Sequence, residues 1–240
     1  KSIKQRLRSD VPLAFCLSGG VDSSALVSLA SKELNYNVTT FSIIDLDKRY
    51  NELENIQHTI RDTGCENHKI FLNPKENYFN RLENLVEYHD SPISTISYLI
   101  HSLISEAVSK RGFRISISGT GADEIFSGYY DHFNLHMYEM RNDFEFDKYV
   151  KDWKDKVLKY VRNPYLKQYD LYIKTPSFRK HVFLNSEVFS GFLNVDFNDS
   201  FKEEFYSKSV LRNRMLNEMF HEVVPVILHE DDLNAMYFSI

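Results

Sequence analysis

What the sequence lacks narrows the class of protein first. The 240-residue chain has only two cysteines, Cys16 and Cys65, and neither belongs to a CxxC pair. This pattern argues against a disulfide scaffold and a structural zinc site, and it fits a reducing cytoplasm in which both cysteines are structural. No apolar run approaches the roughly 20 residues that a membrane helix needs, and no signal peptide is visible.

The chain also lacks an excess of positive charge. It has 34 acidic and 29 basic residues and a formal net charge of -5 at pH 7. That balance argues against extended electrostatic binding of DNA or RNA. The 18 Phe and 15 Tyr residues are therefore expected to pack in a core rather than to stack on bases. With 42% hydrophobic and 26% charged residues, the composition is that of a globular protein.

The two ends of the sequence look cut. The first residue is Lys1 rather than Met, and residues 234–240 read as the interior of a helix without a Gly, Asn or Pro stop. We therefore expect the chain to be a fragment of a longer protein.

Short apolar runs alternate with helical periodicity in the first half. The runs cover residues 11–17, 38–44, 68–72 and 113–117, and the helical segments cover residues 2–9, 22–34, 51–63 and 93–110. Strands that alternate with helices predict an α/β fold, an open parallel sheet with helices on both faces. Asp90 and Ser91 are expected to cap the long helix at 93–110.

The second half of the sequence has a different residue pattern. Residues 131–226 read mainly as helices with loops, and no internal repeat is visible. We therefore predict an α/β core over residues 1–130 and a mainly helical annex over residues 131–240.

A glycine loop follows the first apolar run and opens a helix. Its sequence is Ser18-Gly19-Gly20-Val21-Asp22-Ser23-Ser24. The glycines let the backbone approach an oxyanion, and the helix N-terminus offers N–H groups and a positive dipole end. Asp22 would repel phosphate unless a divalent cation lay between them, and Mg²⁺ is the usual choice. The alternative is an ordinary strand-to-helix turn with good N-cap residues.

A second glycine loop follows the last apolar run. It reads Ser118-Gly119-Thr120-Gly121-Ala122-Asp123-Glu124. Because ligands bind beyond the carboxyl ends of parallel strands, this loop is expected near the first one. Asp123 would then be a second carboxylate for Mg²⁺, opposite Asp22.

Together with further motifs, the two glycine loops resemble those of the glutamine-hydrolysing asparagine synthetases. The first loop has no Lys after its glycines, so it is not a GxxxxGK[ST] loop, and it resembles the pyrophosphate-binding loop of the PP-loop ATP pyrophosphatases. The further matching phrases are Arg8-Ser9-Asp10-Val11-Pro12, Phe41-Ser42-Ile43, His89-Asp90-Ser91-Pro92, the continuation Ile125-Phe126-Ser127-Gly128-Tyr129 and residues 232–240. The resemblance is thin between residues 131 and 226.

The resemblance implies a role for particular residues. Those expected to hold the pyrophosphate portion of ATP are Ser18, Gly19, Gly20, Asp22 and Ser23. Asp22 and Asp123 would bind Mg²⁺. The backbone near Cys16, Ile43, Ser118 and Gly119 would border the adenosine.

The implied activity is ATP-dependent amide formation. A carboxylate is adenylated with release of pyrophosphate, and ammonia then displaces AMP, the nearest case being aspartate to asparagine. The family implies that an N-terminal glutaminase domain outside this chain supplies the ammonia. Assembly as a homodimer is left open.

Several positions depart from the family pattern. Thr120 stands where asparagine synthetases carry Glu, and a Thr hydroxyl can hydrogen-bond but is no base near neutral pH. Glu87 or His89 could replace the missing base. Leu233 stands where many members have Arg, and a functional Lys lies beyond residue 240 in the family. We therefore expect the isolated chain to lack full activity, with Asp123 and Thr120 as its catalytic candidates.

Three alternatives stay open at this stage. The substrate could be another carboxylate, such as a sugar acid or a peptide, or the chain could bind nucleotide without activity. Another AMP-forming family, acting in tRNA modification or GMP synthesis, fits residues 118–129 and 232–240 poorly. The run His229-Glu230-Asp231-Asp232 could suggest a metal site, but we expect its acids to open the last helix.

Overall fold

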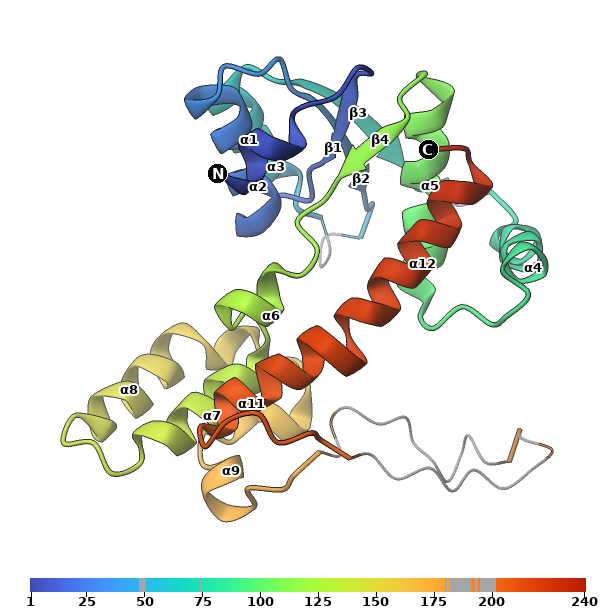
Figure 1. Cartoon of the computed structure of the whole chain (residues 1–240). Coiled ribbons are helices and arrows are strands. Elements are labelled where there is room, and N and C mark those ends of the chain that lie inside the picture. The colour runs from blue at the N-terminus through green and yellow to red at the C-terminus, as the bar shows by residue number, and fades with distance from the viewer. Residues whose placement is uncertain (48–50, 74, 180, 182–190, 193, 195–201) are drawn as a thin grey trace. The chain divides into compact units, whose positions relative to one another are not determined.

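The computed structural model describes residues 1–47, 51–73, 75–179, 181, 191, 192, 194 and 202–240 (Figure 1). Contacts divide the chain into two compact units. The first unit comprises Lys1–Thr120 and Pro225–Ile240, and the second comprises Gly121–Val224. The predicted domain boundary at residues 130 and 131 stays a prediction, because a compact unit is not by itself an independently folding domain.

The first unit contains a four-stranded parallel sheet in the order β3-β2-β1-β4. The strands are β1 (Leu13–Cys16), β2 (Thr39–Ile44), β3 (Glu66–Phe71) and β4 (Ile115–Ile117). All four predicted strands are present, with shifted or shorter bounds. In the register, Phe15 of β1 lies opposite Thr40 of β2 and Ile117 of β4.

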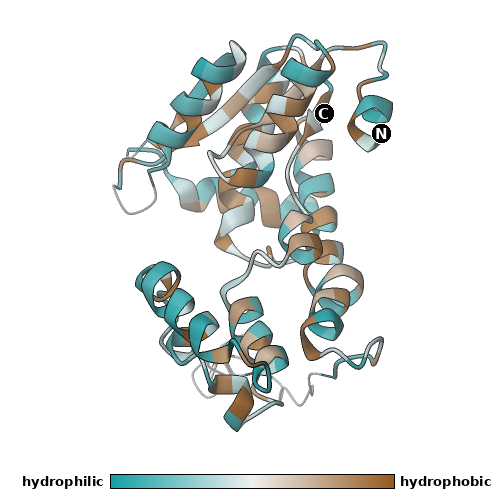
Figure 2. Ribbon diagram, turned by 90° about the vertical axis from the view of Figure 1, so that its left-hand side faces the viewer, coloured by the Kyte–Doolittle hydropathy of each residue, from teal (hydrophilic) through white to brown (hydrophobic). Residues whose placement is uncertain are grey.

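Helices precede, connect and follow these strands. They are α1 (Ser2–Arg6), α2 (Val21–Ser28) with a π-helical continuation η1 (Leu29–Glu33), α3 (Leu53–Thr63), α4 (Tyr78–His89), α5 (Ile96–Lys110) and, near the end of the chain, α12 (Val224–Tyr237). Figure 2 shows the helices around the sheet with both hydrophilic and hydrophobic stretches, as amphipathic helices have.

Helices cover both faces of the sheet. Because side chains alternate along a strand, Leu13 and Phe15 of β1 point to one face and Ala14 to the other. The first face packs in a core with Val27 of α2 and Ile56 of α3, while Ala14 packs with Phe41 of β2 and with α5. The predicted α/β architecture is confirmed.

The strand order places a switch point beside β1. The chain leaves β1 through α2 to β2 on one side, whereas β4 joins β1 on the other side after α4 and α5. In such sheets the ligand crevice lies beyond the carboxyl ends of the two strands at the switch. The two glycine loops follow those two strands, so the topology makes them neighbours.

The prediction that Asp90 and Ser91 cap the long helix was wrong. The N-cap of α5 is Thr95, whose side chain accepts a hydrogen bond from the Ser97 N–H at 3.2 Å. Asp90 instead ends α4 in the left-handed conformation, with φ of 52°. Helix α4 was not predicted, although the Asn77 side chain caps it by accepting from the Phe79 N–H.

The last helix was also placed wrongly. It begins at Val224 rather than at the acidic run, because Pro225 suits a first helical turn. The run from His229 to Asp232 therefore lies inside α12. The helix ends at Tyr237, before the end of the chain, where its interior was predicted to continue.

The second unit is helical in its described part, as predicted. Its elements are α6 (Ala122–Phe126), α7 (Tyr130–Met140), α8 (Phe146–Lys156), α9 (Leu171–Lys174), α11 (Val210–Asn217) and the short segments η2 (Leu158–Tyr160), η3 (Pro164–Lys167) and η5 (Glu218–Glu222). Met137, Val150 and Trp153 form a hydrophobic core in it. Among the residues that the structure describes, in both units, no helix is long and apolar enough to cross a membrane.

Candidate functional site

The first glycine loop turns sharply and lies against the start of α3. Gly19 has φ of +89°, a left-handed conformation that side chains rarely adopt. A Cβ atom on Gly19 would also lie 3.1 Å from the Glu52 carbonyl oxygen and 3.1 Å from the Asn55 Cβ. Both the turn and the close packing therefore require glycine at this position.

The Ser23 hydroxyl organises the loop from within. Its oxygen lies 3.0 Å from the Ser18 hydroxyl, accepts from the Ser18 N–H at 3.2 Å and donates to the Gly20 carbonyl at 3.3 Å. The Ser18 hydroxyl also accepts from the Gly20 N–H at 3.2 Å. Ser23 is buried whereas Ser18 is exposed. Ser23 thus shapes the loop, and Ser18 presents its hydroxyl to solvent.

Helix α2 begins with an N-cap that has no side chain. Gly20 is extended there, with φ of −69° and ψ of 161°, and the next residue, Val21, is 83% exposed. The first turns of a helix leave backbone N–H groups without intrahelical partners, and these groups attract anions. Asp22 is half-buried in the same turn.

The second glycine loop touches the first. A Cβ atom on Gly119 would lie 3.1 Å from the Ser23 backbone nitrogen and 3.2 Å from the Asp22 Cβ. Beside it, the exposed Ser118 hydroxyl donates to the exposed Thr120 hydroxyl at 2.9 Å. Ser118, Gly119 and Thr120 therefore extend the surface that the first loop begins.

Asp123 belongs to the second unit, in the first turn of α6. Gly121 caps this helix in the left-handed conformation, with φ of +90°. A Cβ atom on Gly128 would lie only 1.6 Å from Asp123 Oδ1. Since Asp22 lies in the first unit, the pairing of the two carboxylates around Mg²⁺ stays a prediction.

Two residues expected to border adenosine lie at strand ends. Ile43 is half-buried near the end of β2, and Cys16 is the last residue of β1. Burial raises the pKa of the Cys16 thiol and the charge of Asp231 raises it further, while a hydrogen bond with Ser116 lowers it. Both cysteines are free thiols, and Cys16 is a neutral group rather than an activated nucleophile.

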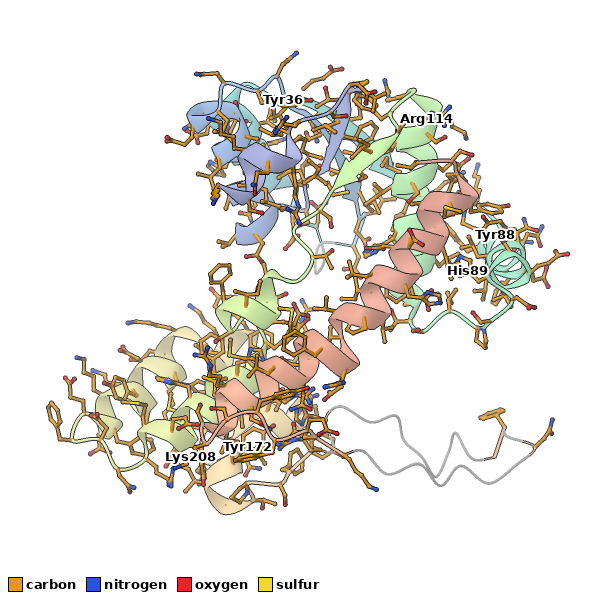
Figure 3. All side chains as sticks on the ribbon, viewed as in Figure 1. Tyr36, Tyr88, His89, Arg114, Tyr172 and Lys208 are labelled. Atoms are coloured by element: carbon orange, nitrogen blue, oxygen red, sulfur yellow. The ribbon has the colours of Figure 1, made fainter. Side chains whose placement is uncertain are left out.

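His89 lies inside the first unit rather than at the loops. Its side chain is 0% exposed, and its Nδ1 atom lies 3.7 Å from Glu230 Oε2 of α12. Burial lowers the pKa of His89, partly offset by the charge of Glu230. Figure 3 labels His89 on α4 beside α12. A residue enclosed in this way is poorly placed to contact a substrate, and Glu87 is exposed on α4.

A pair that the sequence did not reveal joins α5 to α12. His101 Nδ1 lies 3.0 Å from Asp231 Oδ1. The two residues are 130 positions apart and carry no motif, so no local signal links them.

The second unit contains a buried charge network. Asp131, His132 and Glu218 bring possible ligand atoms within 4.8 Å of one another. The Arg214 Nε atom, however, lies 3.0 Å from Glu218 Oε1, and its Nη1 atom lies 2.6 Å from Glu222 Oε2. A guanidinium group already neutralises these carboxylates, so the cluster is a structural ion-pair network rather than a metal centre.

Comparison with known proteins assigns the chain to a family. The asparagine synthase family matches the chain over residues 1–240. Asparagine synthetase [glutamine-hydrolyzing] 1 of Bacillus subtilis is 36% identical over 129 residues, which is 53% of this chain and 20% of that protein. A putative asparagine synthetase 2 of Methanocaldococcus jannaschii is 31% identical over 135 residues, covering 55% of this chain and 25% of that protein.

A relative with a different name also matches. Amidase chyE of Penicillium rubens is 28% identical over 143 residues, covering 54% of this chain and 21% of that protein. In each of these relatives the match spans a quarter of the protein's length or less.

Proposed function

Because the chain belongs to the asparagine synthase family, we propose that it is the ATP-binding synthetase part of an AMP-forming carbon–nitrogen ligase. The observation that carries this proposal is the contact of Gly119 with Asp22 and Ser23. It joins two glycine loops at the switch point of a parallel sheet, where such folds bind nucleotides.

The loop residues fit the pyrophosphate portion of ATP. Gly19 allows the turn of the first loop, Gly119 allows the second loop to approach the first closely, and the first turn of α2 supplies backbone N–H groups. Ser18 adds an exposed hydroxyl. Asp22 and, by proposal, Asp123 would hold Mg²⁺, which neutralises phosphate charge when bound. Cys16, Ile43, Ser118 and Gly119 would border the adenosine.

The proposed reaction has two steps. A substrate carboxylate oxygen attacks the α-phosphorus of ATP, and pyrophosphate leaves. Ammonia then attacks the acyl carbon, and AMP leaves with the former carboxylate oxygen. The protein contributes mainly by positioning the reactants and stabilising charge. By proposal, ammonia comes from glutamine through a glutaminase domain of the full-length protein, and the reaction takes place in the cytoplasm.

Aspartate is the first substrate that we propose, since relatives of the chain are named asparagine synthetases. A second candidate is amidation of another carboxylate, such as a sugar acid or a peptide. Thr120 favours testing it, because the exposed hydroxyl bonds to Ser118 and supplies no carboxylate to the site.

The test is an assay of the full-length protein with ATP, Mg²⁺ and either glutamine or ammonia. Aspartate, glutamate, glucuronate and an acidic peptide are added one at a time, and all nucleotide products are quantified. Carboxylate-dependent AMP and pyrophosphate are expected, and the carboxylate that supports them identifies the acceptor. ADP and phosphate as the products would refute the proposal, and ATP binding without pyrophosphate release would indicate a binding protein.

A further inference from the structure

This inference rests on the proposed function and concerns its second step. The amine that attacks the acyl group must lose a proton. Thr120 supplies no base to accept it, and Asp123 is proposed to hold Mg²⁺. The most suitable ionisable pair in the first unit is His101 of α5 with Asp231 of α12. Their side chains are 42% and 33% exposed, so solvent and small molecules reach them.

His101 continues the sheet-facing stripe of α5. It lies at helical spacing from Ile104 and Val108, and both of those residues pack against Ala14 and Phe41 of the sheet. Helix α5 runs back against the direction of the strands, so its first turns lie toward their carboxyl ends (Figure 1). His101, one turn before Ile104, therefore lies at the end of α5 that is nearer the carboxyl ends of the strands, from which both glycine loops depart.

The charge of the partner carboxylate acts on the last residue of β1. Asp231 acts electrostatically on Cys16, the last residue of β1, and Cys16 lies 3.3 Å from Ser116 of β4. Ser18 and Ser118 each follow two residues later along these strands. The charge of Asp231 therefore reaches the end of β1, the strand that leads into the first glycine loop.

Hydrogen bonding selects the free nitrogen of the imidazole. Asp231 Oδ1 lies 3.0 Å from Nδ1, so Nδ1–H donates to the carboxylate, and the lone pair of Nε2 is left to accept a proton. In the described part of the chain, no protein group hydrogen-bonds to Nε2. A carboxylate behind an imidazole also stabilises the imidazolium that forms when Nε2 is protonated.

The other ionisable groups around the pair do not compete for this role. The Tyr98 ring packs edge-on against His101, and burial, Asp231 and Glu230 raise the pKa of Tyr98 to about 12. Glu230 accepts from the Ser94 N–H and hydroxyl and faces His89. The Cys16 thiol is held neutral by burial.

We propose that His101, oriented by Asp231, is the general base of amide formation. The amine nitrogen forms a bond to the acyl carbon of the acyl-adenylate, and Nε2 of His101 takes one proton from that nitrogen. The bond between the acyl carbon and the AMP oxygen then breaks, and AMP leaves with the electron pair. Asp231 is a positioning residue that fixes the tautomer.

The experiment separates the two half-reactions in the full-length protein. Adenylation is followed by carboxylate-dependent exchange of pyrophosphate into ATP, with aspartate first and then the other panel carboxylates. Amide formation is followed with ammonium chloride as the donor, across a pH series. The variants are His101→Asn, His101→Ala with and without added imidazole, and Asp231→Asn. The matched control is His58→Asn, since His58 pairs with Glu54 on the exposed surface of α3.

We expect His101→Asn to lower amide formation about 100-fold or more while exchange stays within about threefold of wild type. Imidazole should partly restore amide formation in His101→Ala. Asp231→Asn should show a smaller loss on the amide step alone. Equal loss of both half-reactions, or no loss, would overturn the inference and leave the proposed function standing. A wild-type protein without carboxylate-dependent exchange would overturn both.

Discussion

Gly119 faces the first turn of α2 so closely that a Cβ atom on it would lie 3.2 Å from the Cβ of Asp22. This contact joins the loop after β4 to the loop after β1. It also explains why a glycine stands in the middle of a surface otherwise lined by hydroxyl groups. The proposed nucleotide site depends on this close approach.

Replacing Gly119 by Ala should weaken ATP binding. The added methyl group meets the Ser23 backbone nitrogen, which cannot rotate away as a side chain end can, so one loop must shift. We expect the dissociation constant for Mg·ATP to rise about tenfold, equivalent to about 1.4 kcal/mol. Calorimetric titration of the full-length protein with a non-hydrolysable ATP analogue measures this change.

Gly64→Ala is the matched control for that prediction. Gly64 has φ of +67° but open space around its α-carbon. Alanine there should cost roughly 1–2 kcal/mol of unfolding free energy through backbone strain and leave ATP affinity unchanged. If Gly119→Ala binds the analogue as tightly as wild type, the loops do not form the site.

Gly128 should be needed to hold the carboxylate of Asp123. A Cβ at Gly128 would lie 1.6 Å from Asp123 Oδ1, so Gly128→Ala must move that side chain. We expect Gly128→Ala and Asp123→Asn each to lower Mg²⁺-dependent pyrophosphate exchange, roughly tenfold or more. Full exchange activity in Gly128→Ala, with Asp123→Asn inactive, would show that the carboxylate acts from another position.

The architecture of the first unit was predictable because its signals are local. Residues 38–44 form a short apolar run, and β2 covers most of it. Helix α4 was missed although Tyr78, Leu82 and Leu85 follow helical spacing after the cap at Asn77. The start of α12 was misplaced because acidic residues are favoured near helix N-termini, yet Pro225 provided the actual start.

The candidate site was predictable only in part. The glycine loops could be placed at strand ends, and Gly119 confirms that they touch. The pair of His101 and Asp231 could not be predicted, because it depends on two helices that meet across 130 residues. The burial of His89 likewise follows from α12 packing beside α4, which no local pattern encodes.

Arg214 should be essential for the stability of the second unit. It is 2% exposed, and its guanidinium lies 3.0 Å from Glu218 Oε1 and 2.6 Å from Glu222 Oε2. Removing it leaves buried carboxylates uncompensated, so Arg214→Met should lower the unfolding free energy by about 3–5 kcal/mol. Urea unfolding measures this loss. A change below about 1 kcal/mol, the range of an exposed ion pair, would contradict the account of the network.

Glu106 should make part of the stability dependent on pH. Burial alone would raise its pKa, but hydrogen bonds from Lys110 and Arg81 outweigh burial and hold the pKa below the usual value. Because the folded pKa is depressed, the stabilisation is complete above the unfolded value of about 4.3 and is lost as pH falls through the folded pKa.

The comparison of wild type with Glu106→Gln tests this sign. The difference in unfolding free energy, measured by urea titration, should be constant near neutral pH and should shrink as the solution becomes more acidic. A difference that grows toward acid pH would mean that the carboxyl group is stabilised in its neutral form.

The central claim is that ATP is attacked at its α-phosphorus by a substrate carboxylate. The most direct measurement uses the full-length protein, ATP, Mg²⁺, ammonia and an acceptor carboxylate labelled with heavy oxygen, followed by mass spectrometry of the products. The account predicts that AMP acquires one labelled oxygen for each amide formed, since the acyl–oxygen bond breaks when ammonia displaces AMP. Labelled inorganic phosphate together with ADP would contradict it.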